Sequence, residues 1–426
     1  MYKILVVDDS ALMRRVICDI INADSDFRVV DVSADGEDAY NKIKNNPYDL
    51  VVLDMVLPKL QGVDLLAKLY NEKIPFNVVL VSSILKEDTE STIRALEYGA
   101  LDFVVKPIRS GSDTRDVFGK QLKTALHNAT RQSNFKQITV KRAPAARPAP
   151  SAPSAAASTT KSYEDAKRST LERMENVKKS LQATKSSAGT AQTSSTPAAP
   201  AAMEKKPVTQ TAPPPSPPPP KVEKKAPTPS SGSGVRTKKF IALACSTGGP
   251  QALHSFIPML PANLSVPLVL VQHMPEGFTA SLAARLDQIS AINVKEAEDG
   301  EYFKPGWVYI TPGGKHMEIC EDGSRAAFCH LDDSPPVNSL KPCADVMYRS
   351  LARSSFDEII CVVLTGMGAD GSEGIKYLNQ HKRTYVISQE ASTCVVYGMP
   401  KAVEQGGLSN EVVPLNSVAN SIVKRL

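Results

Sequence analysis

The chain has 426 residues, of which 42% are hydrophobic, and its formal net charge is +5 at pH 7. This length allows two or three domains with packed cores, and a charge this small does not by itself indicate nucleic-acid binding. The chain shows no apolar run of membrane-spanning length, no signal-peptide core at its start and no CxxC pair among its seven cysteines. We therefore expect a cytoplasmic protein with reduced, mostly buried thiols.

Residues 1–125 alternate short apolar runs with stretches of helical periodicity. The apolar runs predict strands at Ile4–Val7, Val51–Leu53, Val78–Val81 and Phe103–Val105. Helices are predicted between strands, for example over Ser10–Asn22 and Glu37–Lys44. This order is typical of βα units around a parallel sheet, so one compact α/β domain is expected.

Residues 126–237 form the second region, and most of it is rich in Pro, Ala, Ser, Thr and Lys, with PPPSPPPP at 213–220. Such a composition cannot bury enough apolar surface to offset the entropy of ordering, so a long and mostly disordered linker is expected. Within it, Tyr163–Ala183 carries apolar residues at helical spacing. This segment fits either a transient, solvated helix, which is the simpler interpretation, or a docking helix.

Residues 238–426 resume the alternation of strands and helices. Strands are predicted at Phe240–Ala244, Pro267–Val271, Trp307–Ile310, Ile359–Leu364 and Thr384–Ile387. We expect a second α/β domain, doubly wound around a mainly parallel sheet.

Three carboxylates follow two of the strands predicted in the first domain. Asp8 and Asp9 come directly after Ile4–Val7, and Asp54 comes directly after Val51–Leu53. The carboxyl ends of parallel strands meet at one edge of the sheet, which is where open α/β sheets bind ligands. Carboxylates gathered there repel one another unless a cation lies among them, and their oxygen ligands suit Mg²⁺.

Two further polar residues end the remaining strands of this domain. Ser82 follows Val78–Val81, and Lys106 follows Phe103–Val105. A hydroxyl and an ammonium at this edge can contact and neutralise a phosphoryl group. Each feature alone is weak, because an Asp at a strand end is often only a helix cap. Their combination in this order is specific.

The first domain resembles the receiver domains of two-component signalling, which have a flavodoxin-like fold. The resemblance is carried by VVDDS at 6–10, VVLDMVLP at 51–58, VSS at 81–83 and GALDFVVKP at 99–107. It implies that Asp54 accepts a phosphoryl group from a histidine kinase and that Ser82 and Lys106 contact this group. It also implies a cis peptide bond between Lys106 and Pro107.

The same resemblance implies a Mg²⁺ ion at the phosphorylation site. Asp9, Asp54 and the backbone carbonyl of Val56 would hold the ion, with Asp8 assisting nearby.

In the second domain, Ser246 lies at a predicted strand-to-helix turn. The strand Phe240–Ala244 runs into CSTGGP at 245–250, and a helix is predicted over Gln251–Leu260. Glycines at such a turn allow backbone amides and a helix N-terminus to face a developing oxyanion. The pattern is neither the GxSxG of the α/β-hydrolases nor the GxGxxG of dinucleotide sites.

His273 and Asp370 follow other strands of the same predicted sheet, so both are expected at the edge that carries Ser246. This placement allows a triad in which His273 takes the proton of Ser246 and Asp370 orients the imidazole. Backbone amides of the loop Gly366–Gly368 are candidates for an oxyanion hole. The alternatives are that His273 is structural and that Asp370 only caps the helix predicted at Gly371–Leu378.

The second domain resembles the chemotaxis protein-glutamate methylesterases over nearly its whole length. The matching stretches are ACSTGGP at 244–250, VQHMPEGFT at 271–279, DDSPPVNSLKPCADVMY at 332–348, LTGMGADGSEG at 364–374 and SQEASTCVVYGMP at 388–400. The order receiver, linker and esterase also agrees with that family.

This resemblance implies that Ser246 is the nucleophile, His273 the general base and acid, and Asp370 the orienting carboxylate. The amides of Thr247 and Met367 would stabilise the oxyanion, with no metal in the esterase site. The substrates would be glutamate methyl esters on cytoplasmic helices of methyl-accepting chemoreceptors, releasing methanol, and receptor glutamines for relatives that also deamidate. A chemotaxis histidine kinase would be the other partner, and a monomer is expected.

The resemblance also implies that the unphosphorylated receiver covers the esterase cleft, across a linker that we expect to be longer than is usual in the family. Two other functions were weighed: a phospho-responsive scaffold without chemistry, and a DNA-binding transcription factor. The presence of all three triad residues argues against the first. The absence of a helix-turn-helix pattern and of a basic stripe argues against the second, so no nucleic-acid partner is expected.

Overall fold

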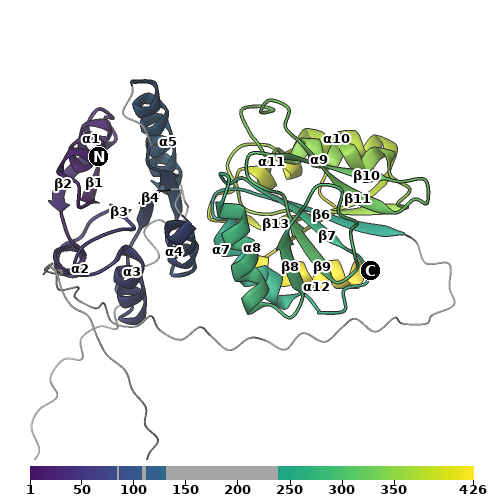
Figure 1. The fold of residues 1–426 in the computed structure, drawn as a ribbon, viewed down its shortest axis with the longest axis horizontal. Helices are drawn as coiled ribbons and strands as arrows, with labels where there is room; N and C mark the ends of the chain where they lie inside the picture. Colours follow the sequence, from purple (N-terminus) through teal and green to yellow (C-terminus); the bar gives the residue numbers. More distant parts are fainter. Residues whose placement is uncertain (84–85, 108–111, 131–237) are drawn as a thin grey trace, which may run out of the picture. The chain divides into compact units, whose positions relative to one another are not determined.

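The computed structural model describes residues 1–83, 86–107, 112–130 and 238–426. These residues form two α/β domains, coloured purple to blue and teal to yellow in Figure 1. Most of the predicted linker, with the segment Tyr163–Ala183, lies outside the described residues. No helix in the described part of the chain is both long and apolar enough to cross a membrane.

The N-terminal domain is built on a five-stranded parallel sheet with the order β2-β1-β3-β4-β5. The strands are β1 (Tyr2–Val7), β2 (Phe27–Ser33), β3 (Leu50–Asp54), β4 (Val78–Ser82) and β5 (Asp102–Val105). The helices are α1 (Ala11–Asn22), α2 (Gly36–Asn45), α3 (Gly62–Asn71), α4 (Lys86–Glu97) and α5 (Ser112–Thr130). The expected domain end at residue 125 therefore falls inside α5.

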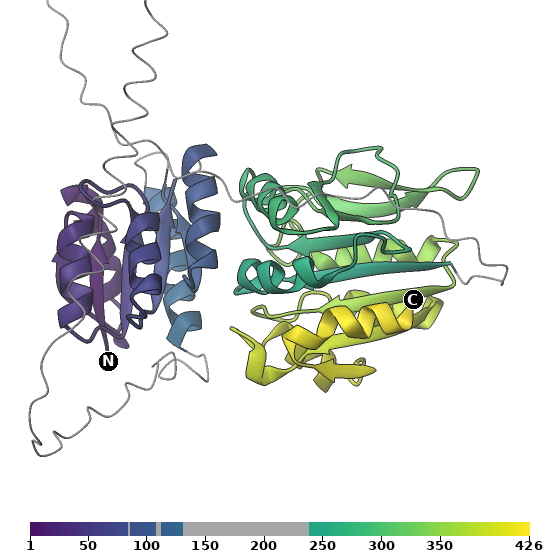
Figure 2. The same ribbon diagram turned by 90° about the horizontal axis from the view of Figure 1, so that it is seen from below.

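Alternating side chains of the central strands build one core on each face of this sheet. Ile4 and Val6 of β1 pack with Ile17 of α1 and Phe118 of α5. Their neighbours in β1 point to the other face and pack with residues of α2, α3 and α4. Figure 2 shows helices along both faces of this sheet. Strands buried on both faces explain the continuous apolar runs in the sequence.

The strand order reverses beside β1, because β2 lies on one side of it and β3 on the other. In parallel α/β sheets a crevice opens at the carboxyl ends of the strands at such a switch point. Asp8 follows β1 and Asp54 ends β3, so the topology places both carboxylates at this crevice.

The C-terminal domain is built on a seven-stranded sheet with the order β14-β13-β12-β6-β7-β9-β8, in which every neighbouring pair is parallel. Its strands are β6 (Lys239–Cys245), β7 (Leu268–Gln272), β8 (Asn293–Glu296), β9 (Trp307–Ile310), β12 (Glu358–Val363), β13 (Arg383–Gln389) and β14 (Glu411–Val413). A separate antiparallel hairpin pairs β10 (His316–Glu321) with β11 (Ala327–Asp332).

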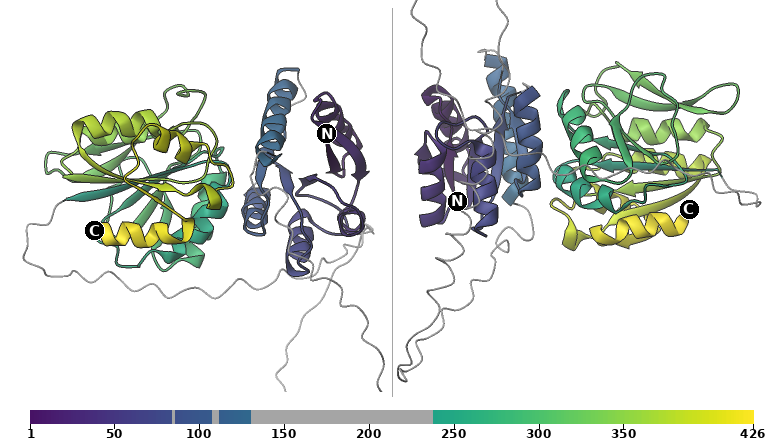
Figure 3. Two further views of the ribbon diagram at one scale, coloured as in Figure 1. Left: turned by 180° about the vertical axis from the view of Figure 1, so that it is seen from behind. Right: turned by 60° about the horizontal axis from the view of Figure 1, so that its bottom comes forward.

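Helices cover both faces of the seven-stranded sheet. They are α7 (Gly249–Phe256), α8 (Phe278–Ile289), α9 (Ala344–Ser350), α10 (Ser372–His381), α11 (Met399–Gln405) and α12 (Leu415–Arg425), with short 3₁₀ turns at Ile257–Met259, Leu351–Arg353 and Ala391–Thr393. Helices α7, α8 and α12 pack on one face, and α9, α10, α11 and the hairpin pack on the other. Figure 3 shows α12 in yellow and the yellow-green α10 on opposite sides of the sheet.

The second domain also has a switch point, at β6. Strand β7 lies on one side of β6 and β12 on the other, with all three strands parallel. The residues that follow these strands, including Ser246, His273 and the loop that begins at Leu364, therefore lie at one edge of the sheet.

Candidate functional site

In the N-terminal domain, the structure brings the three predicted carboxylates together. Ligand oxygens of Asp8, Asp9 and Asp54 all lie within 4.8 Å of one another. The Asp8 and Asp54 side chains are buried, and Asp9 is exposed. Lys106 Nζ lies 2.6 Å from Asp54 Oδ2 and 3.0 Å from Asp8 Oδ2. The predicted pocket therefore exists, and Lys106 reaches into it.

The charges in this pocket are not balanced, because one ammonium faces three carboxylates. Burial, with the added charge of Asp8, raises the pKa of Asp54 to about 6 in spite of Lys106. Burial also opposes the charge of Lys106, but Asp54 and Asp8 outweigh it and raise the pKa of that group. The ionised form of Asp54 is therefore costly until further positive charge arrives.

The donor set fits a magnesium ion. It consists of oxygens alone, from closely spaced carboxylates that carry excess negative charge, which is the chemistry that Mg²⁺ prefers. Val56 follows Asp54 by two residues, and its amide donates a 3.3 Å hydrogen bond to Asp54 Oδ1. The turn that carries the Val56 carbonyl is thus tied to the same carboxylate.

Ser82 and Lys106 lie side by side at this edge. The register of β4 and β5 pairs Ser82 with Val105, and the amide of Lys106 donates a 2.7 Å hydrogen bond to the carbonyl of Ser82. The sequence did not reveal Thr92, whose buried hydroxyl donates a 2.7 Å hydrogen bond to Ser82 Oγ. Thr92 lies on α4, ten residues away, where no local pattern marks this contact.

The expectation of a cis peptide bond between Lys106 and Pro107 was wrong. Within the described residues, the only cis peptide bond joins Lys341 and Pro342. Lys106 reaches both carboxylates with a trans bond, so a cis bond is not needed to bring the ammonium into the pocket.

In the C-terminal domain, Ser246 follows β6 and begins the turn into α7. Its amide donates a 3.0 Å hydrogen bond to the carbonyl of Thr365, and its carbonyl accepts one of 2.7 Å from Gly249. Gly248 has a φ of +76°, which favours glycine. A Cβ atom at Gly249 would lie 1.9 Å from Oε1 of Gln272, so glycine here leaves room for the Gln272 side chain. The local sequence therefore forces the tight turn that displays Ser246.

A hydrogen bond joins the other two predicted triad members. His273 Nε2 lies 2.7 Å from Asp370 Oδ2. A carboxylate only accepts, so Nε2 carries the proton and Nδ1 remains as the basic nitrogen of the neutral ring. Ser246, His273 and the loop with Met367 follow β6, β7 and β12, which are neighbouring strands, so they lie at one edge of the sheet. Among the described residues no hydrogen bond joins the Ser246 hydroxyl to His273, a contact that is often loose without substrate.

Gln272 joins the backbone at Ser246 to that at His273, a contact that the sequence did not reveal. Its buried amide nitrogen donates 3.1 Å hydrogen bonds to the carbonyls of both Ser246 and His273. Its Oε1 accepts a hydrogen bond from the thiol of Cys245. The side chain thereby links the ends of β6 and β7.

Asp370 is the most heavily hydrogen-bonded carboxylate of this edge. Burial opposes its charge, but hydrogen bonds from His273, the Ala344 amide and the Cys343 thiol outweigh burial and lower its pKa. At the start of α10, the Gly371 amide donates to both Asp345 and Asp370, and the Gly374 amide donates to Asp345. The arrangement therefore favours the orienting role of Asp370 over the helix-capping alternative.

The assignment of the Thr247 and Met367 amides as oxyanion donors remains a prediction, and the local hydrogen bonding favours it. Within the described residues, neither the Thr247 amide nor the Met367 amide donates a hydrogen bond. The Gly366 amide, in contrast, donates a 3.0 Å hydrogen bond to the carbonyl of Val396. Of the loop Gly366–Gly368, Gly366 is thus already engaged, while Met367 stays available.

Two other histidines of this domain lie in the hairpin. His316 begins β10, where it is buried, and His330 lies in β11. Among the described residues neither forms a hydrogen bond with Asp370, so His273 remains the predicted base.

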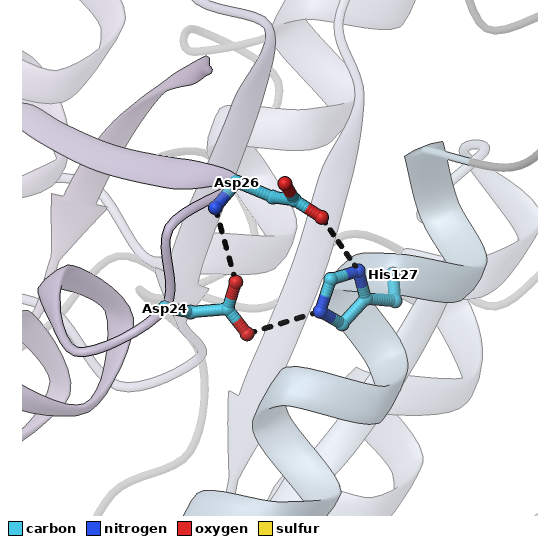
Figure 4. A group of neighbouring side chains, drawn as sticks. All are labelled: Asp24, Asp26 and His127. Carbon is cyan, nitrogen blue, oxygen red and sulfur yellow. Dashed lines mark hydrogen bonds and ion pairs between the residues drawn. The ribbon is translucent and has the colours of Figure 1, made fainter.

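A third cluster of potential ligands lies in the N-terminal domain, at the end of α5 (Figure 4). His127 Nε2 lies 3.0 Å from Asp24 Oδ2, and Nδ1 lies 3.8 Å from Asp26 Oδ2. The Asp26 amide also donates a hydrogen bond to Asp24. Both ring nitrogens thus face carboxylates, and the cluster ties α5 to the loop before β2.

A parallel-sheet domain with an acidic pocket, joined to a domain with Ser, His and Asp at a sheet edge, defines a response regulator that carries a hydrolase. Two family models match the chain: response regulator receiver domain over residues 4–113, and CheB methylesterase over residues 241–422.

Relatives match over the full length. The chain is 34% identical to protein-glutamate methylesterase/protein-glutamine glutaminase 1 of Syntrophomonas wolfei, covering 100% of this chain and 99% of that protein. It is 36% identical to protein-glutamate methylesterase/protein-glutamine glutaminase of Symbiobacterium thermophilum, covering 99% and 96%. The chain therefore belongs to the protein-glutamate methylesterase/protein-glutamine glutaminase family. The solved Thermotoga maritima CheB methylesterase catalytic domain is 41% identical, covering 45% of this chain and 100% of that one, with a TM-score of 0.43.

The expectation that the linker is longer than is usual in the family stays a prediction, because most of this segment lies outside the described residues.

Proposed function

We propose that this chain is a protein-glutamate methylesterase whose activity is raised by phosphorylation of Asp54. The observation that carries the hydrolytic part is the 2.7 Å contact of His273 with the buried Asp370, at the sheet edge that displays Ser246. An imidazole held by a carboxylate beside a serine on a tight turn is the arrangement that acyl transfer requires.

The proposed reaction begins when Ser246 Oγ attacks the carbonyl carbon of a glutamate methyl ester. His273 takes the serine proton at Nδ1, while Asp370 stabilises the imidazolium that forms. The amides of Thr247 and Met367 donate hydrogen bonds to the oxyanion of the tetrahedral intermediate. His273 then gives its proton to the departing methoxide, which leaves as methanol.

The second half of the reaction releases the enzyme. Water attacks the glutamyl ester on Ser246 as His273 accepts a proton from it, and the intermediate collapses to free glutamate and the serine hydroxyl. Glutamine side chains would enter by the same route with ammonia as the leaving group. The names of the relatives include this glutaminase activity, and we propose it here as a second activity of the same site.

In the N-terminal domain, we propose that Asp54 accepts a phosphoryl group from a chemotaxis histidine kinase. Asp9, Asp54 and the Val56 carbonyl would hold Mg²⁺, with Asp8 nearby, and the ion would neutralise phosphoryl charge. Lys106 is already in contact with Asp54 and would keep contact with the phosphoryl oxygens, as would Ser82. The support is the close packing of three carboxylates against one lysine.

The proposed substrates are methyl-accepting chemoreceptors, whose modified glutamates lie on cytoplasmic helices, so we place the activity in the cytoplasm. The C-terminal domain gives no support to a DNA-binding function. Among the described residues, its strands and helices all belong to one α/β fold.

The nucleophile is tested with a serine-reactive phosphonate and with methylated receptor membranes. The phosphonate is expected to label Ser246, as read by peptide mass spectrometry, and Ser246→Ala should lose methanol release by a factor on the order of 10⁴ or more. Ser255→Ala, which changes a serine on the outer side of α7, is the matched control and should keep full activity. Methanol release by Ser246→Ala at the wild-type rate would contradict the proposal, and an unlabelled, inactive wild type would favour the scaffold.

A further inference from the structure

The segment before α9 holds the carboxylate of Asp370. Cys343 Sγ lies 3.1 Å from Oδ1, the Asp345 amide lies 3.0 Å from the same oxygen, and the Ala344 amide lies 2.7 Å from Oδ2. The Gly371 amide also reaches Oδ1, at 3.0 Å. Three of these donors bind Oδ1, whereas Oδ2 accepts hydrogen bonds from the Ala344 amide and from His273.

The thiol of Cys343 is the donor in its contact with Asp370. Burial, together with the charge of Asp370, raises the pKa of Cys343 to about 12, so the sulfur keeps its proton at neutral pH. An ionised carboxylate has no proton to give and only accepts. The side chain of Cys343 is fully buried, so it forms this contact inside the domain.

We propose that Cys343 is a positioning residue for the hydrolytic reaction, whose thiol fixes the Oδ1 side of Asp370 so that Oδ2 meets the imidazole of His273. This inference rests on the proposed triad and deepens it.

The thiol differs from the other donors because it is a side chain. The amides of Ala344, Asp345 and Gly371 are fixed by the backbone, and they hold the carboxylate in any variant that folds. Among the described residues, Cys343 and His273 are the two side chains that donate to Asp370. Removing the thiol leaves Oδ1 with fewer donors in a buried site, which makes the charge of Asp370 less favourable and its orientation less defined.

Other ionisable groups near Asp370 bear on any pH effect. Asp345 lies beside it on α9, and burial, with a contribution from Asp370, raises the pKa of Asp345 against the bonds from Gly374 and Gly371. The remaining groups with an electrostatic effect here are the buried Tyr348 and, on Asp345, the cation of Arg349. Since none of these changes in a Cys343 variant, a shift of the pH profile reports on the lost donor.

Cys361 provides a matched control. It is equally buried, in β12 of the same domain, and among the described residues its thiol has no hydrogen bond in the site. Cys361→Ala therefore removes the same group from the same core without touching Asp370.

The test compares Cys343→Ala, Cys343→Ser and Cys361→Ala in the full chain, by methanol release from methylated receptor membranes between pH 5 and 9. We expect Cys343→Ala to lower kcat about 10-fold with KM within about twofold, because one buried donor to a charge is lost. The acid limb of its profile should move to higher pH, because a carboxylate with one donor fewer attracts the proton of the His273–Asp370 pair more strongly. Cys343→Ser keeps a donor and should restore both the rate and the limb, and Cys361→Ala should match wild type at every pH.

Thermal unfolding of each variant separates positioning from folding. A Cys343→Ala variant with wild-type activity, or with a loss that is equal at all pH values and is shared by Cys343→Ser, would overturn the inference. Asp370→Ala, measured in parallel, separates it from the proposed function. Full activity of Asp370→Ala overturns the triad and the role of Cys343 with it, whereas loss in Asp370→Ala beside normal activity in Cys343→Ala overturns only the latter.

Discussion

Asp54 and Asp370 occupy equivalent places in the two domains, yet their surroundings are opposite. Both are buried carboxylates at the carboxyl edge of a parallel sheet, near a switch point in the strand order. Burial and a neighbouring acid raise the pKa of Asp54 to about 6. Hydrogen bonds from His273, a backbone amide and a thiol lower the pKa of Asp370 despite its burial.

This difference fits the proposed roles, in which Asp54 reacts and Asp370 orients a histidine. Asp54 shares its pocket with Asp8 and Asp9, and among the described residues Lys106 is the one cation paired with it, so its charge is left poorly compensated. Such a group gains when a cation or a charge-neutralising partner arrives. Asp370 is already surrounded by donors and stays ionised in one orientation, as the partner of a catalytic histidine must. The same edge of the same kind of sheet thus supports two different functions.

The largest expected effect is that of Asp370→Asn on hydrolysis. An amide at this position presents an NH₂ group where His273 or a backbone amide now donates, so the imidazole loses its correct tautomer. We expect kcat to fall by a factor on the order of 10⁴, measured by methanol release.

Glu373→Gln, an exposed change at the start of the neighbouring α10, is the control and should leave kcat unchanged. If Asp370→Asn keeps more than a tenth of the wild-type kcat, the donors around Asp370 are structural and the contrast with Asp54 disappears.

A smaller effect is expected on the stability of the N-terminal domain in Asp54→Asn. An Asp in the unfolded chain ionises near 3.8, whereas Asp54 in the fold ionises near 6. The folded state therefore binds the extra proton between these values, and wild type loses stability as pH rises through this window. Asp54→Asn lacks this loss, so its free energy of unfolding should exceed that of wild type by about 1 to 3 kcal/mol above pH 6. The difference should be smaller near pH 4.

Hydrogen exchange of amides in β3 and β4 measures this difference domain by domain. Asp64→Asn, an exposed change on α3, is the control and should show no such trend. Mg²⁺ should stabilise wild type more than Asp54→Asn, since the ion binds the ionised pocket. A stability gap that widens toward pH 4 would contradict the assignment of Asp54 as the strained carboxylate.

The smallest expected effect concerns Thr92, which donates to Ser82 Oγ from α4. Thr92→Val removes this hydroxyl at nearly constant volume, so Ser82 loses the bond that orients it toward the pocket. The rate of Asp54 phosphorylation by a small phosphodonor should change by about threefold, which corresponds to one neutral hydrogen bond. Thr124→Val on the exposed side of α5 is the control, and equal rates in both variants would remove Thr92 from the site.

The strands that build both sites could be predicted from the sequence because they are buried on both faces. Continuous apolar runs mark β1, β3, β4, β6, β7 and β12, and the polar residues that follow them mark the edge. Asp8, Asp54, Ser246 and His273 could be found in this way, since each follows such a run within two residues. The pairing of His273 with Asp370 was predicted from their places after strands of one sheet, and the fold supplies the 2.7 Å contact between residues 97 positions apart.

Other parts left no comparable signal. The edge strand β2 alternates buried and exposed residues, with Val30 and Val32 exposed, so it lacks a continuous apolar run. The hairpin of β10 and β11 mixes polar residues with apolar ones, and no strand was predicted there. Cys343, Gln272 and Thr92 make side-chain contacts with residues that are not their neighbours in the sequence, and neither periodicity nor spacing reveals such contacts.

The most direct test of two carboxylates with separate functions is one assay on three proteins. Methanol release from methylated receptor membranes is measured for wild type, Asp54→Ala and Asp370→Asn, each with and without a small phosphodonor and Mg²⁺. Wild type should be stimulated by the donor, Asp54→Ala should keep the basal rate without stimulation, and Asp370→Asn should lose both rates. Stimulation of Asp54→Ala to the wild-type level, or a basal rate in Asp370→Asn equal to that of wild type, would contradict the account.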